Sequence, residues 1–276
     1  MNDSAIVEQI RHFLDEDIGS GDLTAAIISD TALARAEVMT REPMVVCGQA
    51  WFDAVFKILD KNAMIDWRER EGQRVTAGTT LCSVSGRARA LLSGERTALN
   101  VLQTLSATAT LSRQYADAVA GTGCRVLDTR KTIPGLRLAQ KYAVKCGGCE
   151  NHRMGLYDGV LIKENHIIAA GSIASAVKKA RSSAAAMVEV EVENLQELQQ
   201  AIAAQPDRIM LDNFSLAELA SAVELSRGEI ALEASGDIGL NNIRQVAETG
   251  VDFISIGALT KNVSAINLSM RITLEG

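Results

Sequence analysis

The stretch MVEVEVENLQELQQAIAAQPDRIMLDNFSLAELASAVELSRGEIALEAS, residues 187–235, decides the fold. It contains three short, mostly aliphatic runs, at Met187–Val192, Arg208–Leu211 and Glu229–Leu232. Runs of this length and composition are typical of strands in a sheet core. More polar segments of helical length separate them, so the stretch predicts strands that alternate with helices.

Two helix starts lie between these strands. Asn194 is followed three residues later by Glu197, and Ser215 is followed by Glu218 at the same spacing. An N-cap side chain that accepts hydrogen bonds, followed by such a Glu, satisfies backbone N–H groups at a helix start. Strands alternating with helices form βαβ units, which predicts a parallel sheet.

The same pattern extends in both directions along the chain. Further strand-like runs lie at Cys124–Leu127, Gly159–Ile162 and Asp252–Ile256, and Gly250 stops the helix before the last of them. Six parallel strands either close into a barrel or remain an open, doubly wound sheet. The residues by themselves leave both arrangements open.

The chain before about residue 110 has a mixed texture. The expected helices and strands there are Ala50–Leu59, Met64–Trp67, Thr80–Val84 and Ser93–Val119. We therefore expect an N-terminal domain at 1–110 and a catalytic α/β barrel domain at 111–265. The C-terminal tail, 266–276, can pack back on the N-terminal domain.

Length and composition exclude several protein classes. The 276 residues are 47% hydrophobic and 22% charged, as in globular proteins, and no apolar run is long enough to span a bilayer. Asp3, Glu8 and Arg11 interrupt the first apolar positions, so we expect no secretory signal and no membrane partner. Five cysteines, an odd number, fit reduced thiols in the cytoplasm. A net charge of −6 argues against nucleic-acid binding.

Polar residues and glycines collect where each predicted strand ends. These ends are Asp128–Lys131, Lys163–His166, Glu191, Asp212–Asn213, Ser235–Gly236 and Gly257–Ala258. In parallel α/β folds, the loops after the strands build the active site at one edge of the sheet. Because all six ends carry such residues, an enzyme site is favoured over a coincidence of surface loops.

Cationic residues are concentrated in one third of this acidic chain. They are Arg130, Lys131, Arg137, Lys141, Lys145, His152, Arg153 and Lys163. Guanidinium and ammonium groups at strand ends suit a substrate with several carboxylates or phosphates. Lys141 and Lys145 are spaced i, i+4 on a predicted helix, and we assign these two to a solvated face.

The acidic and glycine-containing strand ends complement these cations. Glu191 and Asp212 end neighbouring strands and offer oxygen ligands of the kind that Mg²⁺ prefers, with phosphates and water completing the shell. Ser235–Gly236 and Gly257–Ala258 can offer backbone N–H groups to a phosphate. Together these features predict chemistry on a phosphorylated substrate.

Cys146 and Cys149 have the spacing of a zinc or redox pair. No second pair of this spacing exists in the sequence, and a structural zinc site needs four ligands. We therefore expect neither a zinc site nor a redox function from this pair.

Nine motifs lie between Leu91 and Thr260, within a similarity that spans about Leu14 to Met270. They are LLSGERTALN at 91–100, DTRKTIPGLR at 128–137, QKYAVK at 140–145, NHR at 151–153, LIKENH at 161–166, EVE at 189–191, LDNF at 211–214, EASG at 233–236 and GALT at 257–260. In this order they resemble the quinolinate phosphoribosyltransferase family, over nearly the whole chain.

The resemblance implies a fold, a reaction and an assembly. The fold is an N-terminal α/β sandwich domain followed by a (β/α) barrel-like domain with fewer than eight strands. The reaction is a pentosyl transfer of de novo NAD biosynthesis, in which quinolinate and phosphoribosyl pyrophosphate give nicotinate mononucleotide, CO₂ and pyrophosphate with Mg²⁺ as cofactor. The assembly is a homodimer with shared active sites, or a higher assembly of such dimers.

The resemblance also implies roles for individual residues. The two quinolinate carboxylates are assigned to Arg130, His152, Arg153 and Lys163, with Arg96 from the neighbouring subunit. Lys131, Glu191 and Asp212 are the implied catalytic residues: Lys131 between the two substrates, and the two carboxylates facing the ribose and Mg²⁺. The 5′-phosphate is assigned to Ser235, Gly236, Gly257 and Lys261.

Two stretches depart from the family pattern, and three alternatives remain to be weighed. Gly147-Gly148-Cys149 stands where the family usually has three glycines, and Ser106–Thr110 differs from its usual Ser-Gly-Ile-Ala-Thr, but neither change removes a charged ligand. A nicotinate phosphoribosyltransferase has only one carboxylate to hold, and a relative associated with molybdate transport is expected to alter the intact DTRKT and NHR motifs. A non-catalytic phosphosugar-binding protein has less need of both Glu191 and Asp212.

Overall fold

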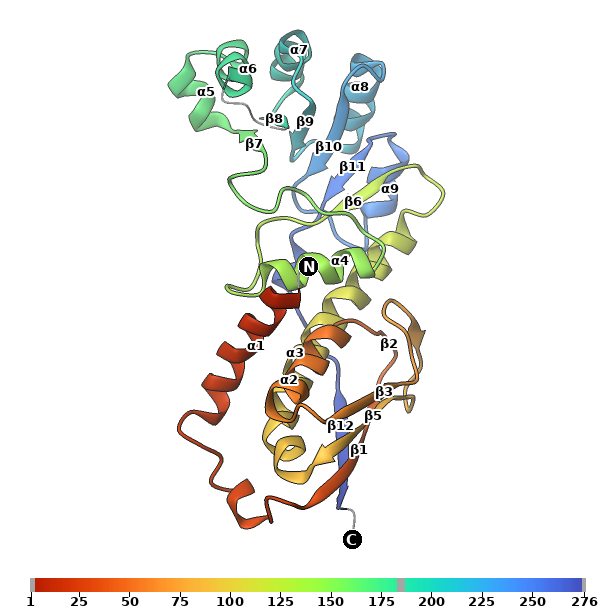
Figure 1. Ribbon diagram of the computed structural model, residues 1–276. Helices are drawn as coiled ribbons and strands as arrows, with labels where there is room; N and C mark the ends of the chain where they lie inside the picture. The colour runs from red at the N-terminus through yellow and green to blue at the C-terminus, as the bar shows by residue number, and fades with distance from the viewer. Residues whose placement is uncertain (1–2, 183–186, 275–276) are drawn as a thin grey trace. The chain divides into compact units, whose positions relative to one another are not determined.

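The computed structural model describes residues 3–182 and 187–274 (Figure 1). The chain divides into two compact units. The first unit comprises Met1–Leu111, Leu138–Gly147 and Val263–Gly276, and the second comprises Ser112–Arg137 and Gly148–Asn262.

The second unit is built on a six-stranded parallel sheet with the order β6-β11-β10-β9-β8-β7. The strands are β6 (Arg125–Leu127), β7 (Val160–Ile162), β8 (Val188–Val192), β9 (Arg208–Asp212), β10 (Ala231–Ser235) and β11 (Phe253–Ser255). This is the cyclic order of a barrel, opened between the edge strands β6 and β7. The predicted α/β class, with a barrel-like sheet of fewer than eight strands, is confirmed.

Helices of the second unit follow the strands and pack against them (Figure 1). They are α5 (Glu164–Ala170), α6 (Ile173–Ser182), α7 (Leu195–Ala204), α8 (Leu216–Ser226), α9 (Ile243–Glu248) and α10 (Ala258–Lys261). Both predicted helix starts are confirmed. Asn194 Oδ1 accepts a hydrogen bond from the Glu197 amide at 2.9 Å, and Ser215 with Glu218 forms a reciprocal capping box.

The strand register brings the polar residues of the sheet to one edge. Glu191 on β8 pairs with Met210 on β9, and Asp212 on β9 pairs with Ser235 on β10. Because side chains two apart in a strand share a face, Glu189 lies on the same face as Glu191, one row deeper in the sheet. The carboxyl ends of these strands therefore carry the polar side chains, above a layer of buried charge.

The first unit contains a four-stranded antiparallel sheet with the order β12-β1-β5-β3. Its strands are β1 (Leu33–Thr40), β3 (Met64–Trp67), β5 (Thr80–Arg87) and β12 (Leu268–Leu274), and the short β2 (Met44–Val45) pairs with β4 (Arg74–Val75). Residues of β1 alternate strictly between exposed and buried, as expected for a sheet with one face on the core. The C-terminal strand β12 completes this sheet.

Helices α1 (Asp3–Ile18), α2 (Gln49–Leu59) and α3 (Ala88–Ala118), with the 3-10 turn Ala25–Ile27, accompany this sheet. Trp51, Phe52 and Phe56 of α2 are fully buried and supply the largest core side chains. A Cβ atom at Gly94 of α3 would lie 2.9 Å from Leu59 Cδ1, so the glycine is required for the close approach of α3 to α2.

Helix α4 (Arg137–Cys146) differs from expectation in two respects. Residues Leu138–Gly147 belong to the first unit, although the sequence pattern placed them in the barrel domain. The assignment of Lys141 to a solvated face is wrong, because its side chain is completely buried, whereas Lys145 is exposed. The buried face of α4 is apolar at Ala139, Ala143 and Val144, and Lys141 falls on it.

Among the described helices, none combines the length and the low polarity needed to cross a lipid bilayer.

Candidate active site

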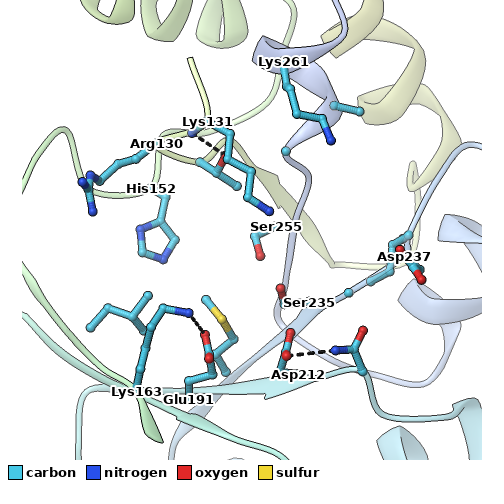
Figure 2. A pocket seen from close by; sticks show the side chains of 18 of the residues that line it. Arg130, Lys131, His152, Lys163, Glu191, Asp212, Ser235, Asp237, Ser255 and Lys261 are labelled. Carbon is cyan, nitrogen blue, oxygen red and sulfur yellow. Dashed lines mark hydrogen bonds and ion pairs between the residues drawn. The ribbon is translucent and has the colours of Figure 1, made fainter. Parts of the chain in front are cut away.

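A cavity of about 750 Å³ opens at the carboxyl ends of the parallel strands in the second unit (Figure 2). The pocket lies at the edge of the sheet where the polar residues at the strand ends led us to expect an active site. Eleven of the twelve predicted site residues line this pocket: Arg130, Lys131, His152, Arg153, Lys163, Glu191, Asp212, Ser235, Gly236, Gly257 and Lys261.

Arg96 is the predicted site residue that does not line the pocket. It lies on α3 within the first unit, and its side chain is exposed. The structure of a single chain thus leaves its guanidinium available to another molecule.

Two segments between β6 and β7 bring Arg130, Lys131, His152 and Arg153 to the pocket. Asp128, directly after β6, is completely buried and accepts hydrogen bonds from the His152 amide at 2.9 Å and from Asn151 Nδ2 at 2.6 Å. The Asp128 carboxylate thereby fixes the segment that carries His152 and Arg153. This role of Asp128 was not predicted from the sequence, where Asp128 stands at a strand end as one acidic residue ahead of Thr129, Arg130 and Lys131.

Lys131 is fixed by its backbone and by a close approach. Its amide donates to Thr129 Oγ1 at 3.1 Å, and its carbonyl accepts from Thr260 Oγ1 at 2.9 Å. A Cβ atom at position 257 would lie 3.1 Å from Lys131 Cδ, so Gly257 leaves room for the lysine side chain. The glycine after β11 therefore makes room for the cationic side chain of Lys131.

Lys163 and Glu191 form an ion pair at the end of the neighbouring strands β7 and β8 (Figure 2). The Lys163 side chain is partly exposed to the pocket, while that of Glu191 is largely buried. This ion pair sets one cation of the pocket against one of the three carboxylates that line it, the other two being Asp212 and Asp237.

Asp212 Oδ2, in contrast, accepts a hydrogen bond from Asn213 Nδ2 at 2.9 Å, and Asp212 forms no ion pair among the described residues. Asn213 adopts a left-handed backbone conformation, with φ at 58°. A Cβ atom at position 236 would lie 2.0 Å from Asn213 Oδ1, so only glycine fits there. The Ser235–Gly236 step thus accommodates the turn that presents Asp212.

Both ring nitrogens of His152 face protein groups. Nδ1 accepts a hydrogen bond from the Arg153 amide at 2.8 Å, while Nε2 lies 2.8 Å from Glu189 Oε2 and 3.5 Å from Glu233 Oε2. The imidazole is only 6% exposed. His152 is therefore held from two sides by the chain itself.

A layer of buried charge lies beneath His152. Glu189 and Glu233 are fully buried, and Arg208 Nη1 lies 2.8 Å from Glu233 Oε2 while its guanidinium stacks on Phe253, 4.0 Å from the ring centre. Burial and the neighbouring Glu189 charge raise the pKa of Glu233 to about 7, and burial also raises the pKa of Glu189. Glu189 and Glu233 belong to two of the sequence motifs, but their role beneath His152 was not predicted, although the alternation in Val188-Glu-Val-Glu191 places Glu189 on the face of Glu191.

The pocket carries an excess of positive charge. Burial and the nearby Arg130 charge lower the pKa of Arg153 from its usual value. The Glu189 and Asp158 carboxylates offset part of this effect, and an arginine in such a setting remains protonated, so a bound anion relieves the remaining repulsion between the cations. The arrangement suits a ligand with several negative groups.

The two cysteines of the C-x-x-C pattern have different surroundings. Cys149 Sγ donates to the Ser112 carbonyl at 3.1 Å within the second unit, whereas Cys146 Sγ lies 3.7 Å from the Val46 carbonyl within the first. Both are free thiols.

Comparison with protein families matches almost the whole chain. Residues 22–106 match the family model described as quinolinate phosphoribosyl transferase, N-terminal domain, and residues 108–271 match that of the C-terminal domain.

Named relatives and solved structures agree with these matches. The chain is 42% identical to the probable nicotinate-nucleotide pyrophosphorylase [carboxylating] of Bacillus subtilis, covering all of this chain and 96% of the relative. The rat nicotinate-nucleotide pyrophosphorylase [carboxylating] is 38% identical, over 91% of this chain and 86% of its own. A solved nicotinate-nucleotide pyrophosphorylase from Francisella tularensis superposes with a TM-score of 0.95 at 48% identity, covering 99% of this chain and 98% of the other. Human nicotinic acid phosphoribosyltransferase, at 12% identity and a TM-score of 0.65, covers 93% of this chain and 75% of its own and shares the fold.

Proposed function

The chain belongs to the quinolinate phosphoribosyl transferase family, and we propose that it converts quinolinate and phosphoribosyl pyrophosphate to nicotinate mononucleotide, CO₂ and pyrophosphate. It is then a pentosyltransferase of de novo NAD biosynthesis. The observation that carries this proposal is the convergence of Arg130, Lys131, Arg153, Lys163 and Lys261 on one pocket in a chain of net charge −6.

The charge of the two substrates matches this pocket. Quinolinate carries two carboxylates, and phosphoribosyl pyrophosphate carries a 5′-phosphate and a pyrophosphate. Arginine forks suit the carboxylates, and lysines act as point charges for phosphate oxygens. Arg130, Arg153 and Lys163 therefore hold quinolinate, while Lys131 and Lys261 reach the phosphoribosyl group together with the amides at Ser235 and Gly236.

The reaction asks the protein mainly to position and neutralise its substrates. The pyridine nitrogen attacks the anomeric carbon while pyrophosphate leaves, and positive charge develops on the ribose ring. The new N-glycosidic bond makes the ring nitrogen positive, which stabilises the carbanion left when the adjacent carboxylate departs as CO₂. A proton from solvent then takes the place of that carboxylate on the ring carbon. A pocket that holds both substrates in line supplies most of the required rate enhancement through orientation and fixed charges.

The acidic residues of the pocket fit a divalent cation. Asp212 offers carboxylate oxygens at the pocket edge, and Glu191 stands one row deeper beside Lys163. Carboxylates combined with substrate phosphates form the usual ligand set of Mg²⁺. When bound, Mg²⁺ offsets the negative charge of the leaving pyrophosphate. Asp212 is the more direct ligand, because Glu191 is engaged by Lys163.

The proposal extends to a homodimer in the cytoplasm with two composite sites. The exposed position of Arg96 on α3 supports it, since this arginine can then complete the quinolinate site of the neighbouring subunit.

One incubation tests the proposed function. The protein is mixed with phosphoribosyl pyrophosphate, Mg²⁺ and either quinolinate or nicotinate. Quinolinate should give nicotinate mononucleotide with one CO₂ per turnover, and nicotinate should react far more slowly. A preference for nicotinate, or binding of quinolinate without turnover, would overturn the assignment in favour of a nicotinate transferase or a binding protein.

A further inference from the structure

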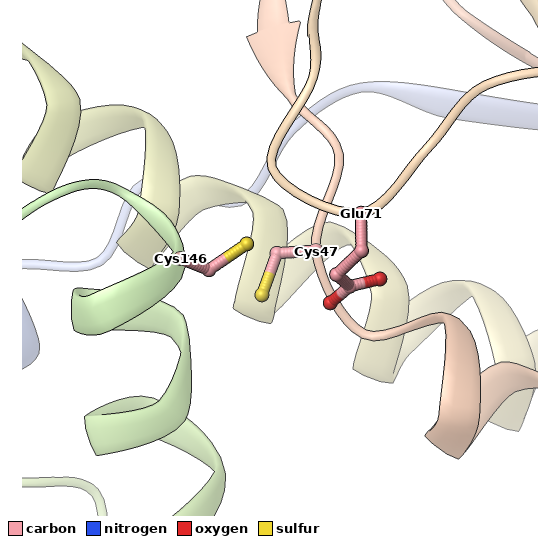
Figure 3. A group of neighbouring side chains, drawn as sticks. All are labelled: Cys47, Glu71 and Cys146. Carbon is pink, nitrogen blue, oxygen red and sulfur yellow. The ribbon is translucent and has the colours of Figure 1, made fainter.

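Three side chains from separate segments of the first unit meet at one point (Figure 3). Cys47 precedes α2, Glu71 lies in the turn between β3 and β4, and Cys146 is the last residue of α4. The two sulfur atoms and a carboxylate oxygen all lie within 4.8 Å of one another. Cys47 is buried, whereas Glu71 and Cys146 are partly exposed, so solvent reaches the cluster from their side.

We propose that Cys47, Glu71 and Cys146 form a zinc-binding site that the proposed activity does not use. Thiolates and carboxylates are zinc ligands, and three protein ligands with a water molecule form a complete tetrahedral shell. With Zn–S bonds of about 2.3 Å and Zn–O bonds of about 2.0 Å, the ligand atoms of such a site lie roughly 3.5–4 Å apart. The observed upper limit of 4.8 Å lies about 1 Å above this range.

The Glu71 carboxylate is already oriented for this role. Its Oε1 accepts a hydrogen bond from the Gly48 amide at 2.7 Å, and its Oε2 accepts one from the Gln49 amide at 3.2 Å. The Tyr142 hydroxyl also forms a hydrogen bond with this carboxylate. Partners of this kind fix the direction of metal ligands, and three hydrogen bonds leave one of the four carboxylate lone pairs for the metal.

Charge around the two thiols favours a soft cation. Cys47 is buried beside Cys146 and Glu71, so a cation held between the three side chains compensates the charge of the thiolates. Cys146 lies at the carboxyl end of α4, where the helix dipole attracts positive charge. Zinc displaces the protons of both thiols and releases them to solvent. Mg²⁺ does not compete, because it prefers oxygen ligands.

Cys149 provides a matched control. It is also buried, and burial raises its pKa to about 12, but its sulfur contacts the Ser112 carbonyl in the second unit. A site built on the C-x-x-C spacing would need Cys149, whereas the site proposed here needs Cys47 in its place.

The experiment titrates full-length, reduced and chelator-treated protein with Co²⁺, followed by displacement with Zn²⁺. Wild type should bind one ion per chain, give the near-ultraviolet charge-transfer band of cobalt thiolate, and release two protons. Cys146→Ser and Cys47→Ser should weaken binding at least about 100-fold, and Glu71→Gln about tenfold. Cys149→Ser should bind like wild type.

Cys146 is partly exposed, so Cys146→Ser should fold normally, and thermal unfolding separates lost binding from lost structure. Zinc should raise Tm in wild type and Cys149→Ser but leave it unchanged in Cys146→Ser. Three outcomes would overturn the proposal: no thiolate band in reduced wild type, binding that depends on Cys149, or binding that survives in Cys146→Ser. If Cys47 and Cys146 form a disulfide in air and the reduced protein binds no metal, the proposal is also overturned.

Discussion

Nε2 of His152 lies 2.8 Å from Oε2 of Glu189, a carboxylate with no exposed surface. On the other side of the ring, Nδ1 accepts a hydrogen bond from the Arg153 amide. Since an accepting Nδ1 carries no proton, the proton of a neutral imidazole lies on Nε2, against the buried carboxylates. His152 thus fixes the position of the loop that carries Arg153 relative to the strand that carries Glu189.

Replacing Glu189 with Gln should misplace this loop without removing any group that lines the pocket. We expect kcat/KM for quinolinate to fall roughly 100-fold, since small displacements of a positioning group cost about that much. Steady-state kinetics with both substrates checks this. The control is Glu193→Gln, an exposed residue just after β8, which should leave the rate unchanged. Equal rates for the two variants would contradict the positioning role of Glu189.

Glu233 should make the stability of the protein depend on pH. Its pKa of about 7 in the folded protein lies above its usual 4.5, so the folded state holds this proton more tightly than the unfolded state. The stabilisation is complete at low pH and is lost as the pH rises toward 7. Relative to wild type, Glu233→Gln should therefore gain up to about 3 kcal/mol in free energy of unfolding between pH 4.5 and pH 8.

Urea unfolding of both proteins at several pH values measures this difference. A constant difference across the range would show that Glu233 titrates normally.

Removing the Lys163 ammonium should cost turnover rather than stability. Lys163→Met keeps the length of the side chain but deletes a pocket cation, and we expect kcat/KM to fall at least about 100-fold. Circular dichroism and Tm should stay near wild-type values, because the side chain is 44% exposed. Lys178→Met, at an exposed position on α6, serves as the control and should be fully active. Retained activity in Lys163→Met would remove this lysine from the quinolinate site.

We expect the dependence of activity on Mg²⁺ to require the Asp212 carboxylate. Asp212→Asn should raise the Mg²⁺ concentration for half-maximal rate by about tenfold or more, because a neutral amide is a weaker ligand. Activity measured against Mg²⁺ concentration, with Glu224→Gln on the exposed face of α8 as control, tests this. Unaltered wild-type activity in excess chelator would refute the metal requirement as a whole.

Arg96 gives a test of the shared site. Arg96→Ala and Lys163→Met should each be nearly inactive alone. In a mixed dimer, one composite site contains both substitutions and the other contains neither. Random exchange of equal amounts makes half of the dimers mixed, so roughly a quarter of wild-type activity should be restored. Differently tagged chains establish that mixed dimers form. If they form and remain inactive, Arg96 acts within its own chain or only in its structure.

The local elements of this protein follow from its sequence. Asn194 and Ser215 start helices as predicted, because a capping side chain and the Glu three residues later act within one helical turn. The strand ends also identify most pocket residues, because parallel strands present their carboxyl ends at one edge whatever the details of packing. The i, i+4 spacing of Lys141 with Lys145 does not show which side of α4 meets the core, so the burial of Lys141 was not predicted.

The sequence by itself thus determined the alternation of strands and helices and the edge at which Lys163, Glu191 and Asp212 gather. Tertiary structure alone decided that the sheet opens between β6 and β7, that Glu189 lies against His152, and that Cys146 meets Cys47 rather than Cys149. The physical reason is the distance along the sequence over which each kind of interaction acts. Caps and strand ends depend on neighbours a few residues away, whereas register and packing join residues that no local pattern connects.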